Sequence, residues 1–270
     1  MAAARNNRRR RRGRGRFGGL LKVLCALAVV VALTMGVTVF FQVEHVEVSG
    51  NHRYTAEEVI AASGIQVGDN LYHMNKFAVA REMLEELPYT RELLIRRRLP
   101  STIVITMTEW GAVARVQAPP AGTVVSGEEG ENPPEVARED WLISVGGKLL
   151  EPASADSDAI LVTGITPIMP RAGTKLALPQ AEAEKSAALI TLLQELENLS
   201  LLDQVSSIDL ASTHMMVRYA GRFDVKLPLT GDLNYKLRVL MAVVDGQLDE
   251  QAAGELDLTQ EGVAALYTPE

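Results

Sequence analysis

The four histidines have the widest chemical range of any side chains in this chain, because a neutral imidazole can bind a metal ion and exchange a proton near neutral pH. They are His45, His52, His73 and His214. No two of them have the i, i+4 spacing of a helical zinc pair, and the single cysteine, Cys25, has no second thiol with which to share a metal or a disulfide. We therefore expect ordinary surface or core histidines and no metal site.

The sequence also lacks the patterns that position a nucleophile or a phosphate. It contains no Gly-x-Ser-x-Gly elbow, no Ser-x-x-Lys of the penicillin-binding transpeptidases and no Walker-type loop. Residues 13–18 fit Gly-x-Gly-x-x-Gly formally, but no strand precedes them, and Arg/Gly-rich composition explains the match. We expect no catalytic site, no cofactor and no small-molecule substrate.

An apolar stretch organises the chain. Residues 23–41 contain no charged side chain, and at the helical rise these 19 residues span roughly 28 Å, close to the hydrocarbon thickness of a bilayer. A secretory signal core is shorter and precedes a small-residue cleavage site, whereas Phe40, Phe41 and Gln42 stand at the end of this run. The pattern predicts an uncleaved, single membrane-spanning helix; a buried core helix is the alternative.

The charges flanking this stretch predict its orientation. Residues 1–22 carry eight arginines and Lys22 without any acidic residue, whereas the rest of the chain carries 18 basic and 34 acidic residues. Basic segments beside a membrane helix stay in the cytoplasm and attract anionic lipid. We therefore expect a type II plasma-membrane protein with a cytoplasmic tail at 1–22. Nucleic-acid binding by the arginines is the competing reading, and we do not expect it.

The residues after the anchor predict an α+β protein with two outer domains. The first, at 43–115, has the order β-α-α-β-β, with a Thr-x-x-Glu capping box at Thr55 and a helix that ends before Pro88. Its three strands would leave two open sheet edges, where another polypeptide can add a strand. Residues 116–139 are rich in Pro, Gly and acid and predict a flexible linker.

The second domain, at 140–270, mixes strands and helices. A hairpin is expected at 140–151 about Gly146 and Gly147, and amphipathic helices are expected at 182–199 and 233–245. Further strands are expected at 160–163, 205–210, 215–219, 223–227, 254–258 and 263–267.

Two stretches of the first outer domain are VEHVEVSGNHRYTAEEVIAASGIQVGDNLYHMN and RRRLPSTIVITMTEWGAVARV. They contain a V-x-V-x-G-N strand end, a G-x-x-x-G-x-N-L run from Gly64 and a basic-x-P-x-T-I-x-I run from Arg98. Together they resemble the POTRA domain of the bacterial cell-division family FtsQ/DivIB. YAGRFDVKL and ELDLTQEGVAALYTPE resemble its β domain. The resemblance covers the chain from Lys22 onward except the insert, which is longer than is usual in the family.

This resemblance implies a non-catalytic scaffold, enriched at the septum, that helps control septal peptidoglycan synthesis. It implies contacts with bitopic division proteins of the FtsL and FtsB/DivIC type, and with further members of the divisome. Carried over to matching positions, the partner-binding residues would be Asp257, Leu258, Thr259, Gln260, Val263, Ala264, Ala265, Leu266 and Tyr267. A buried closing strand is the alternative reading of 263–267. Arg96, Arg97 and Arg98 are a second candidate contact, although a solvated basic strand end is the favoured explanation of these residues.

Two other classes of function remain open from the sequence. A cell-wall enzyme would need a set of convergent titratable groups that no motif indicates. A POTRA-bearing secretion or assembly component is the other, although the chain lacks a long series of amphipathic membrane strands.

Overall fold

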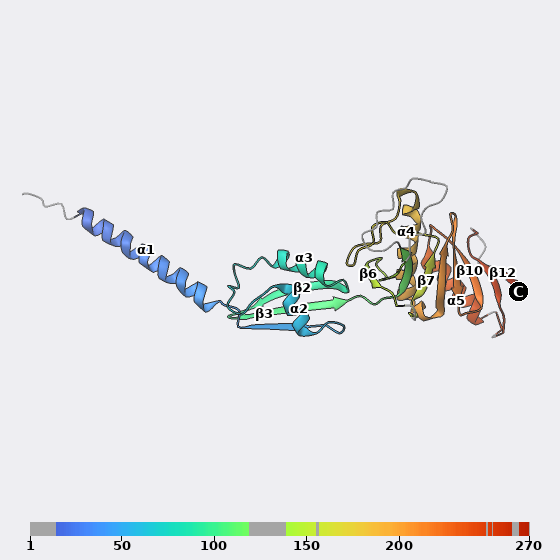
Figure 1. Cartoon of the computed structure of the whole chain (residues 1–270), viewed down its shortest axis with the longest axis horizontal. Helices are drawn as coiled ribbons and strands as arrows, with labels where there is room; N and C mark the ends of the chain where they lie inside the picture. The colour runs from blue at the N-terminus through green and yellow to red at the C-terminus, as the bar shows by residue number, and fades with distance from the viewer. Residues whose placement is uncertain are drawn as a thin grey trace, which may run out of the picture.

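The computed structural model describes residues 15–118, 139–154, 157–246, 248–249, 251–260 and 265–269. Figure 1 shows three parts in a row: a long helix, a small α/β unit and a larger β-rich unit. The predicted α+β fold class is confirmed, since the chain combines an N-terminal apolar helix, a small unit of the order β-α-α-β-β and a further mixed domain.

The first part is α1 (Gly15–Phe40), which projects away from the rest of the chain (Figure 1). Its window Gly18–Gly36 has a mean hydropathy of 2.2, and none of that window is buried inside the protein. By length and composition this helix fits a single membrane anchor. It begins eight residues before the predicted apolar run at 23, because the preceding Arg/Gly-rich residues contain no proline to interrupt the helix.

The small unit consists of β1 (His45–Ser49), α2 (Ala56–Ser63), α3 (Lys76–Glu86), β2 (Thr90–Arg98) and β3 (Thr102–Glu109). The sheet order is β1-β3-β2, with β1 parallel and β2 antiparallel to the central β3. Ile103, Ile105 and Met107 of β3 are buried and pack with Val59 of α2 and Met83 of α3 in one core. The predicted order β-α-α-β-β is therefore confirmed.

The predicted capping box at the start of α2 is present. The Thr55 hydroxyl accepts from the backbone N–H of Glu58, and the Glu58 carboxylate accepts from the backbone N–H of Thr55 at 2.8 Å. These bonds hold the pKa of the Glu58 carboxyl below its ordinary value. Gly64 ends the helix with φ of 62°, as expected of a left-handed cap.

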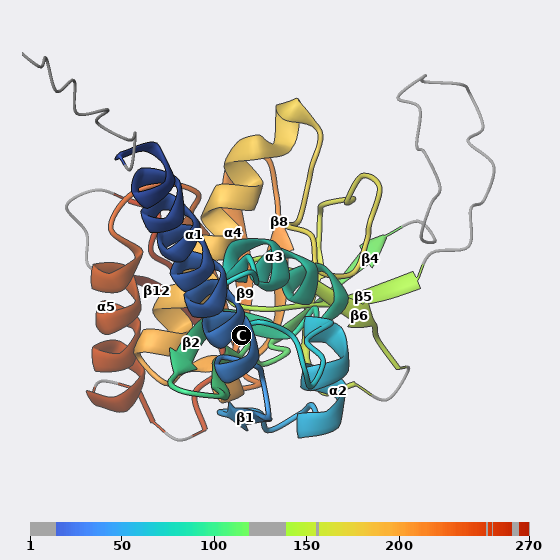
Figure 2. The same cartoon turned by 90° about the vertical axis from the view of Figure 1, so that its left-hand side faces the viewer.

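The larger unit is a sheet in the order β12-β11-β10-β9-β8-β7-β4-β5-β6. Its strands are β4 (Ala114–Ala118), β5 (Glu139–Ile143), β6 (Leu149–Pro152), β7 (Ile160–Thr163), β8 (Val205–Leu210), β9 (His214–Tyr219), β10 (Phe223–Pro228), β11 (Gly254–Asp257) and β12 (Leu266–Pro269). In Figure 2, β12 and β6 lie toward opposite sides of this sheet. Its helices are α4 (Ala183–Asn198) and α5 (Leu233–Gly246), with short 3-10 turns η1 (Gln180–Glu182) and η2 (Leu202–Gln204).

One face of the large sheet is covered by α4 and α5. Leu192 of α4 and Leu237 of α5 join Val217 and Val225 of the central strands in one buried core. Alternate residues on the same strands face the other side and remain half-buried, including Arg218 and Asp224, whose side chains pair at 2.9 Å. The amphipathic stripes predicted from the sequence thus cover one face of the sheet and leave a polar face.

Strand β4 corrects the predicted division of the chain. The sequence predicts that the first domain ends at 115 and that a linker begins at 116, but Ala114–Ala118 is a single strand that pairs with β5 and β7 in the large sheet. Ala114, Val116 and Ala118 are buried in that sheet's core, which is why the strand cannot belong to the linker. We propose that the boundary lies between the end of β3 and the start of β4.

Glycine substitutions test the close approach of β1 to β3. Gly50 has φ of 81°, and a Cβ built there would lie 2.0 Å from the Met107 carbonyl oxygen. Gly50→Ala should lower the free energy of unfolding by about 2–5 kcal/mol, since left-handed backbone strain and overpacking add. Gly64→Ala is the matched control, because its φ is 62° but no atom lies within 4 Å of the added Cβ. It should cost only about 1–2 kcal/mol. Urea titration of the full chain in detergent measures both, and equal losses would contradict the predicted clash.

Candidate polypeptide-binding edge

Strand β12 forms one end of the large sheet. It pairs with β11 in antiparallel register, Leu256 opposite Tyr267 and Asp257 opposite Leu266. Within the described part of the chain, no further strand pairs with its outer side. Backbone N–H and C=O groups on that side can therefore accept an added strand. In Figure 1 this edge lies at the end of the molecule remote from α1.

The structure places most of the predicted partner-binding residues on or beside this edge. Asp257 ends β11, Thr259 and Gln260 follow it, and Leu266 and Tyr267 begin β12. Val263 and Ala264 lie outside the described residues. The expected strand at 263–267 differs from the observed one, since β12 is Leu266–Pro269 and Ala265 precedes it.

These residues differ in what they can present to a partner. Leu258 is fully buried in the core, so only its backbone can take part. Leu266 is 52% exposed and offers an apolar side chain beside the open edge. Tyr267 is half-buried, and its hydroxyl donates to the Ala253 carbonyl at 3.0 Å. The described part of this strand is thus partly buried. It is neither a fully buried closing strand nor a fully exposed binding edge.

The turn after β11 is held by local hydrogen bonds. The Thr259 backbone N–H donates to the Asp257 carboxylate at 2.8 Å, and the Lys236 ammonium of α5 donates to the Gln260 carbonyl at 3.0 Å. Burial acts to raise the pKa of the Asp257 carboxyl, but the bonds from Thr259 and the charges of Lys226 and His214 leave that pKa below its ordinary value. The edge therefore carries an ionised aspartate at neutral pH.

The three consecutive arginines at the end of β2 are partly engaged within the protein. Arg98 pairs with Glu47 of β1. Arg97 donates to the Met74 carbonyl at 2.8 Å. Arg96 is exposed. Two of the three predicted contact residues thus have structural roles in the small unit.

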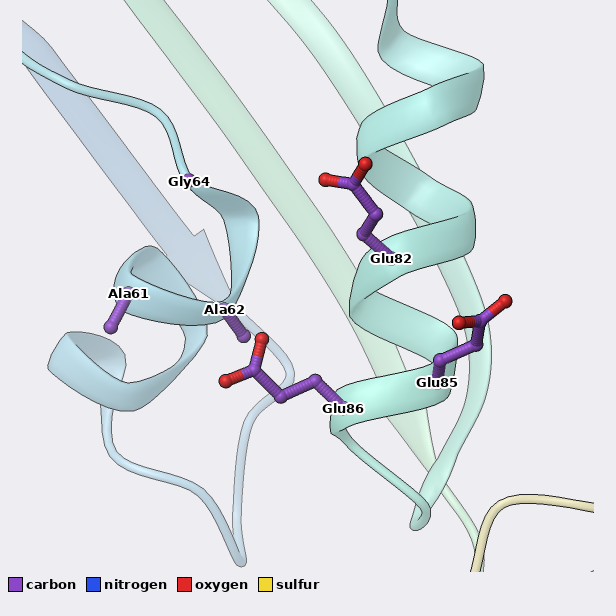
Figure 3. A pocket seen from close by; sticks show the side chains of 6 residues that line it. All are labelled: Ala61, Ala62, Gly64, Glu82, Glu85 and Glu86. Carbon is purple, nitrogen blue, oxygen red and sulfur yellow. The ribbon is translucent and has the colours of Figure 1, made fainter.

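A groove between α2 and α3 is lined by acidic side chains. Glu82, Glu85 and Glu86 surround a space of about 450 Å³ beside Ala62 and Gly64. Figure 3 shows Glu86 pointing toward α2 and Glu85 pointing away from it, so the carboxylates diverge. No group of three or more potential ligands for a metal ion lies together anywhere in the described part of the chain. The groove has the geometry of a solvated acidic surface.

The contact between the two units was not expected from the sequence. The Arg53 guanidinium lies 3.8 Å from the centre of the Tyr89 ring and pairs with Glu151 of β6 at 2.7 Å. The Tyr89 hydroxyl donates to the same carboxylate at 2.7 Å. Lys148 donates to the Thr90 carbonyl at 3.2 Å, and burial lowers the pKa of its ammonium. The β6 edge of the large sheet therefore meets the small unit, which leaves the β12 edge as the outward-facing one.

Packing beside this polar contact brings together residues far apart in the sequence. A Cβ on Gly146 would lie 2.8 Å from the Trp110 ring, and the Arg91 guanidinium lies 4.6 Å from the centre of that ring. No local sequence motif predicts these contacts, because each residue stands in an ordinary surface or turn sequence. Only the folded structure shows that they lie together.

The described elements define a class of protein: an apolar helix long enough to cross a membrane, followed by a small three-stranded α/β unit and a β-rich domain with an open sheet edge. Comparison with known proteins narrows this class. Residues 41–110 match the model of the POTRA domain, FtsQ-type. The chain is 31% identical over 94 residues to the cell division protein FtsQ of Corynebacterium glutamicum, which covers 33% of this chain and 42% of that protein.

Two DivIB proteins extend the comparison. The chain is 38% identical over 74 residues to the cell division protein DivIB of Geobacillus kaustophilus, covering 27% of this chain and 28% of that one. The DivIB of Clostridium acetobutylicum is 23% identical over 228 residues, or 83% and 81% of the two chains. The chain thus matches less than half the length of the first two relatives. These similarities confirm the FtsQ/DivIB family resemblance predicted from the sequence.

The pKa of Tyr89 gives the contact between the units a pH dependence. Burial, with the hydrogen bond to Glu151, raises the pKa of the Tyr89 hydroxyl well above its ordinary value of 10.0. Above about pH 10, the Tyr89 hydroxyl loses its proton in the unfolded chain while it keeps it in the folded chain. The stability that the protonated hydroxyl contributes is therefore complete below about pH 10 and is lost as the pH rises above that value. Tyr89→Phe should make the fall in unfolding free energy above pH 10 shallower than in the wild type.

Urea titrations at a series of alkaline pH values measure this slope. Each alkaline titration is compared with one at pH 7, which separates the loss of the Tyr89 hydroxyl from its titration. A Tyr89→Phe curve parallel to the wild type would contradict the assignment.

Proposed function

We propose that this chain is a non-catalytic, membrane-anchored scaffold of the bacterial division machinery. The single observation that carries the proposal is the FtsQ-type POTRA match directly after an apolar helix, in a chain similar to proteins named for cell division. In this proposal α1 spans the plasma membrane once, and the basic residues before it stay in the cytoplasm. The POTRA unit and the β-rich domain then lie outside the cytoplasm, at the division septum.

The open β12 edge supports a role in recruiting other polypeptides. An added strand gains main-chain hydrogen bonds there, while Leu266 and Tyr267 supply side-chain contacts beside it. The opposite edge, β6, already meets the POTRA unit through Glu151. We propose that bitopic division proteins of the FtsL and FtsB/DivIC type bind the β12 edge through Asp257–Gln260 and the residues from Val263 to Tyr267. Through them the chain would help control septal peptidoglycan synthesis.

Depletion and complementation in the source bacterium test this proposal. Loss of the chain should give filamentous cells, and the wild-type gene should restore division. Ala265→Pro and Leu266→Arg should fail to restore division and should no longer co-purify the FtsL- and DivIC-type proteins. Proline fixes the backbone just before β12 and removes an N–H donor there. Arginine places a charge where an apolar side chain would contact the partner.

Met169→Arg is the matched control, since Met169 is 60% exposed. Its loop lies beside β6, at the opposite end of the sheet from β12, because the Gly173 N–H donates to the Leu149 carbonyl. This variant should divide normally and retain both partners. Normal division after depletion would refute the divisome role. Normal partner recovery by both edge variants would refute the β12 edge alone.

A further inference from the structure

Exposed apolar side chains gather at one end of the POTRA unit. Among its described residues, large apolar side chains at least half exposed are Val67 at 77%, Tyr72 at 50%, Phe77 at 76% and Leu99 at 56%. The proposed function assigns no role to any of them. Their position in the fold indicates what they contact.

Backbone hydrogen bonds fix Val67 and Tyr72 at the end where α1 enters. The Gly68 N–H donates to the Val43 carbonyl at 2.8 Å, and the Leu71 N–H donates to the Phe41 carbonyl at 2.9 Å. The segment that carries Val67 and Tyr72 therefore runs beside the residues that leave the membrane helix.

The other two side chains belong to the same end. Leu99 lies in the turn between β2 and β3, and the Ser101 carbonyl in this turn accepts from the Glu44 N–H at 2.8 Å. Phe77 lies in the first turn of α3, whose preceding segment receives the hydrogen bond from Arg97 to the Met74 carbonyl. In Figure 1 the starts of β1 and β3 lie at this end of the small unit, next to α1.

The connection from α1 to this end is too short to act as a spacer. The helix ends at Phe40, Gln42 already forms a β-bridge with Asn70, and Val43 is 1% exposed in the POTRA core. With about 3.3–3.6 Å of reach per residue, a membrane-spanning α1 holds the unit close to the membrane surface that the helix leaves.

The side chains at this end suit the boundary between water and lipid. Phe40, Phe41 and Tyr72 form a chain of edge-to-face contacts with ring centres 5.2 Å apart in each pair. The Lys76 ammonium lies 5.3 Å from the Phe77 ring, and the Arg97 guanidinium lies 5.9 Å from the Tyr72 ring. Aromatic rings with adjacent cations on long stems are typical of residues that lie among lipid headgroups.

We propose that Val67, Tyr72, Lys76, Phe77, Arg97 and Leu99 form a membrane-facing rim that inserts into the headgroup layer of a bilayer containing anionic lipid. The rim fixes the orientation of the POTRA unit on the membrane. Lipid is the occupant that the structure favours, because Phe40 and Phe41 connect Tyr72 of the rim to α1, and the cations of the rim complement anionic headgroups. The inference rests on the proposed membrane span by α1.

Quenching by spin-labelled lipid tests the rim in the full chain. The protein is reconstituted into vesicles of equal parts phosphatidylcholine and phosphatidylglycerol, with nitroxide lipid labelled near the headgroup. Phe77→Trp and Leu99→Trp each add one tryptophan at the rim. The two native tryptophans, Trp110 and Trp141, give a common background because Trp110 follows β3 at the far end of the POTRA unit and Trp141 lies in β5.

His52→Trp is the matched control, since His52 is exposed in the turn after β1, beside the far end of β3. We expect nitroxide lipid to reduce the added emission of either rim variant and to leave that of His52→Trp unchanged. Emission from both rim variants that is no more quenched than the control would overturn the rim. We first check that the wild-type protein floats together with the vesicles in a density gradient. If it does not, the membrane span is refuted, and the rim with it. If it floats but the rim variants are not quenched, the rim alone is refuted.

Discussion

The passage from α1 into the POTRA core is the constraint on which the rest of the structure depends. Phe41 touches Tyr72, Gln42 pairs with Asn70, and Val43 is already a core residue, so the helix and the first folded unit share a boundary without a spacer. In the proposed membrane span, this junction determines which end of the unit faces lipid. The distance of the larger sheet from the membrane then depends on the same junction.

A second junction, between the POTRA unit and β6, orients the large sheet relative to the POTRA unit. Arg53, Tyr89 and Glu151 join the units through charge-assisted and aromatic contacts. The chain then enters the large sheet at β4, the third strand from its β6 edge. The exposed Arg53–Glu151 pair is worth at most about 1 kcal/mol by itself, so its importance lies in orientation more than in stability. The β6 edge meets the POTRA unit, and the β12 edge points away from it (Figure 1).

Short sequence motifs predict those features that depend only on neighbouring residues. The capping box at Thr55 and the neighbouring strands at 215–219 and 223–227 are predictable because each depends on only a few adjacent residues. The place of β4 was not readable, since a five-residue strand next to a Pro/Gly-rich stretch gives no sign of its parallel partner β7. The candidate edge was indicated only by family resemblance, and its register with β11 came from the structure. The Tyr89–Glu151 contact joins residues 62 apart and had no signal at all.

Protease accessibility tests the central claim that a single helix holds two folded units on the outer side of the membrane. Protease is added to intact spheroplasts of the source bacterium, and a cytoplasmic protein serves as the control for lysis. The account predicts that the residues after α1 are digested, while a fragment containing the basic tail and α1 survives in the membrane. Full protection of the POTRA unit and the β-rich domain, with digestion only after lysis, would contradict it.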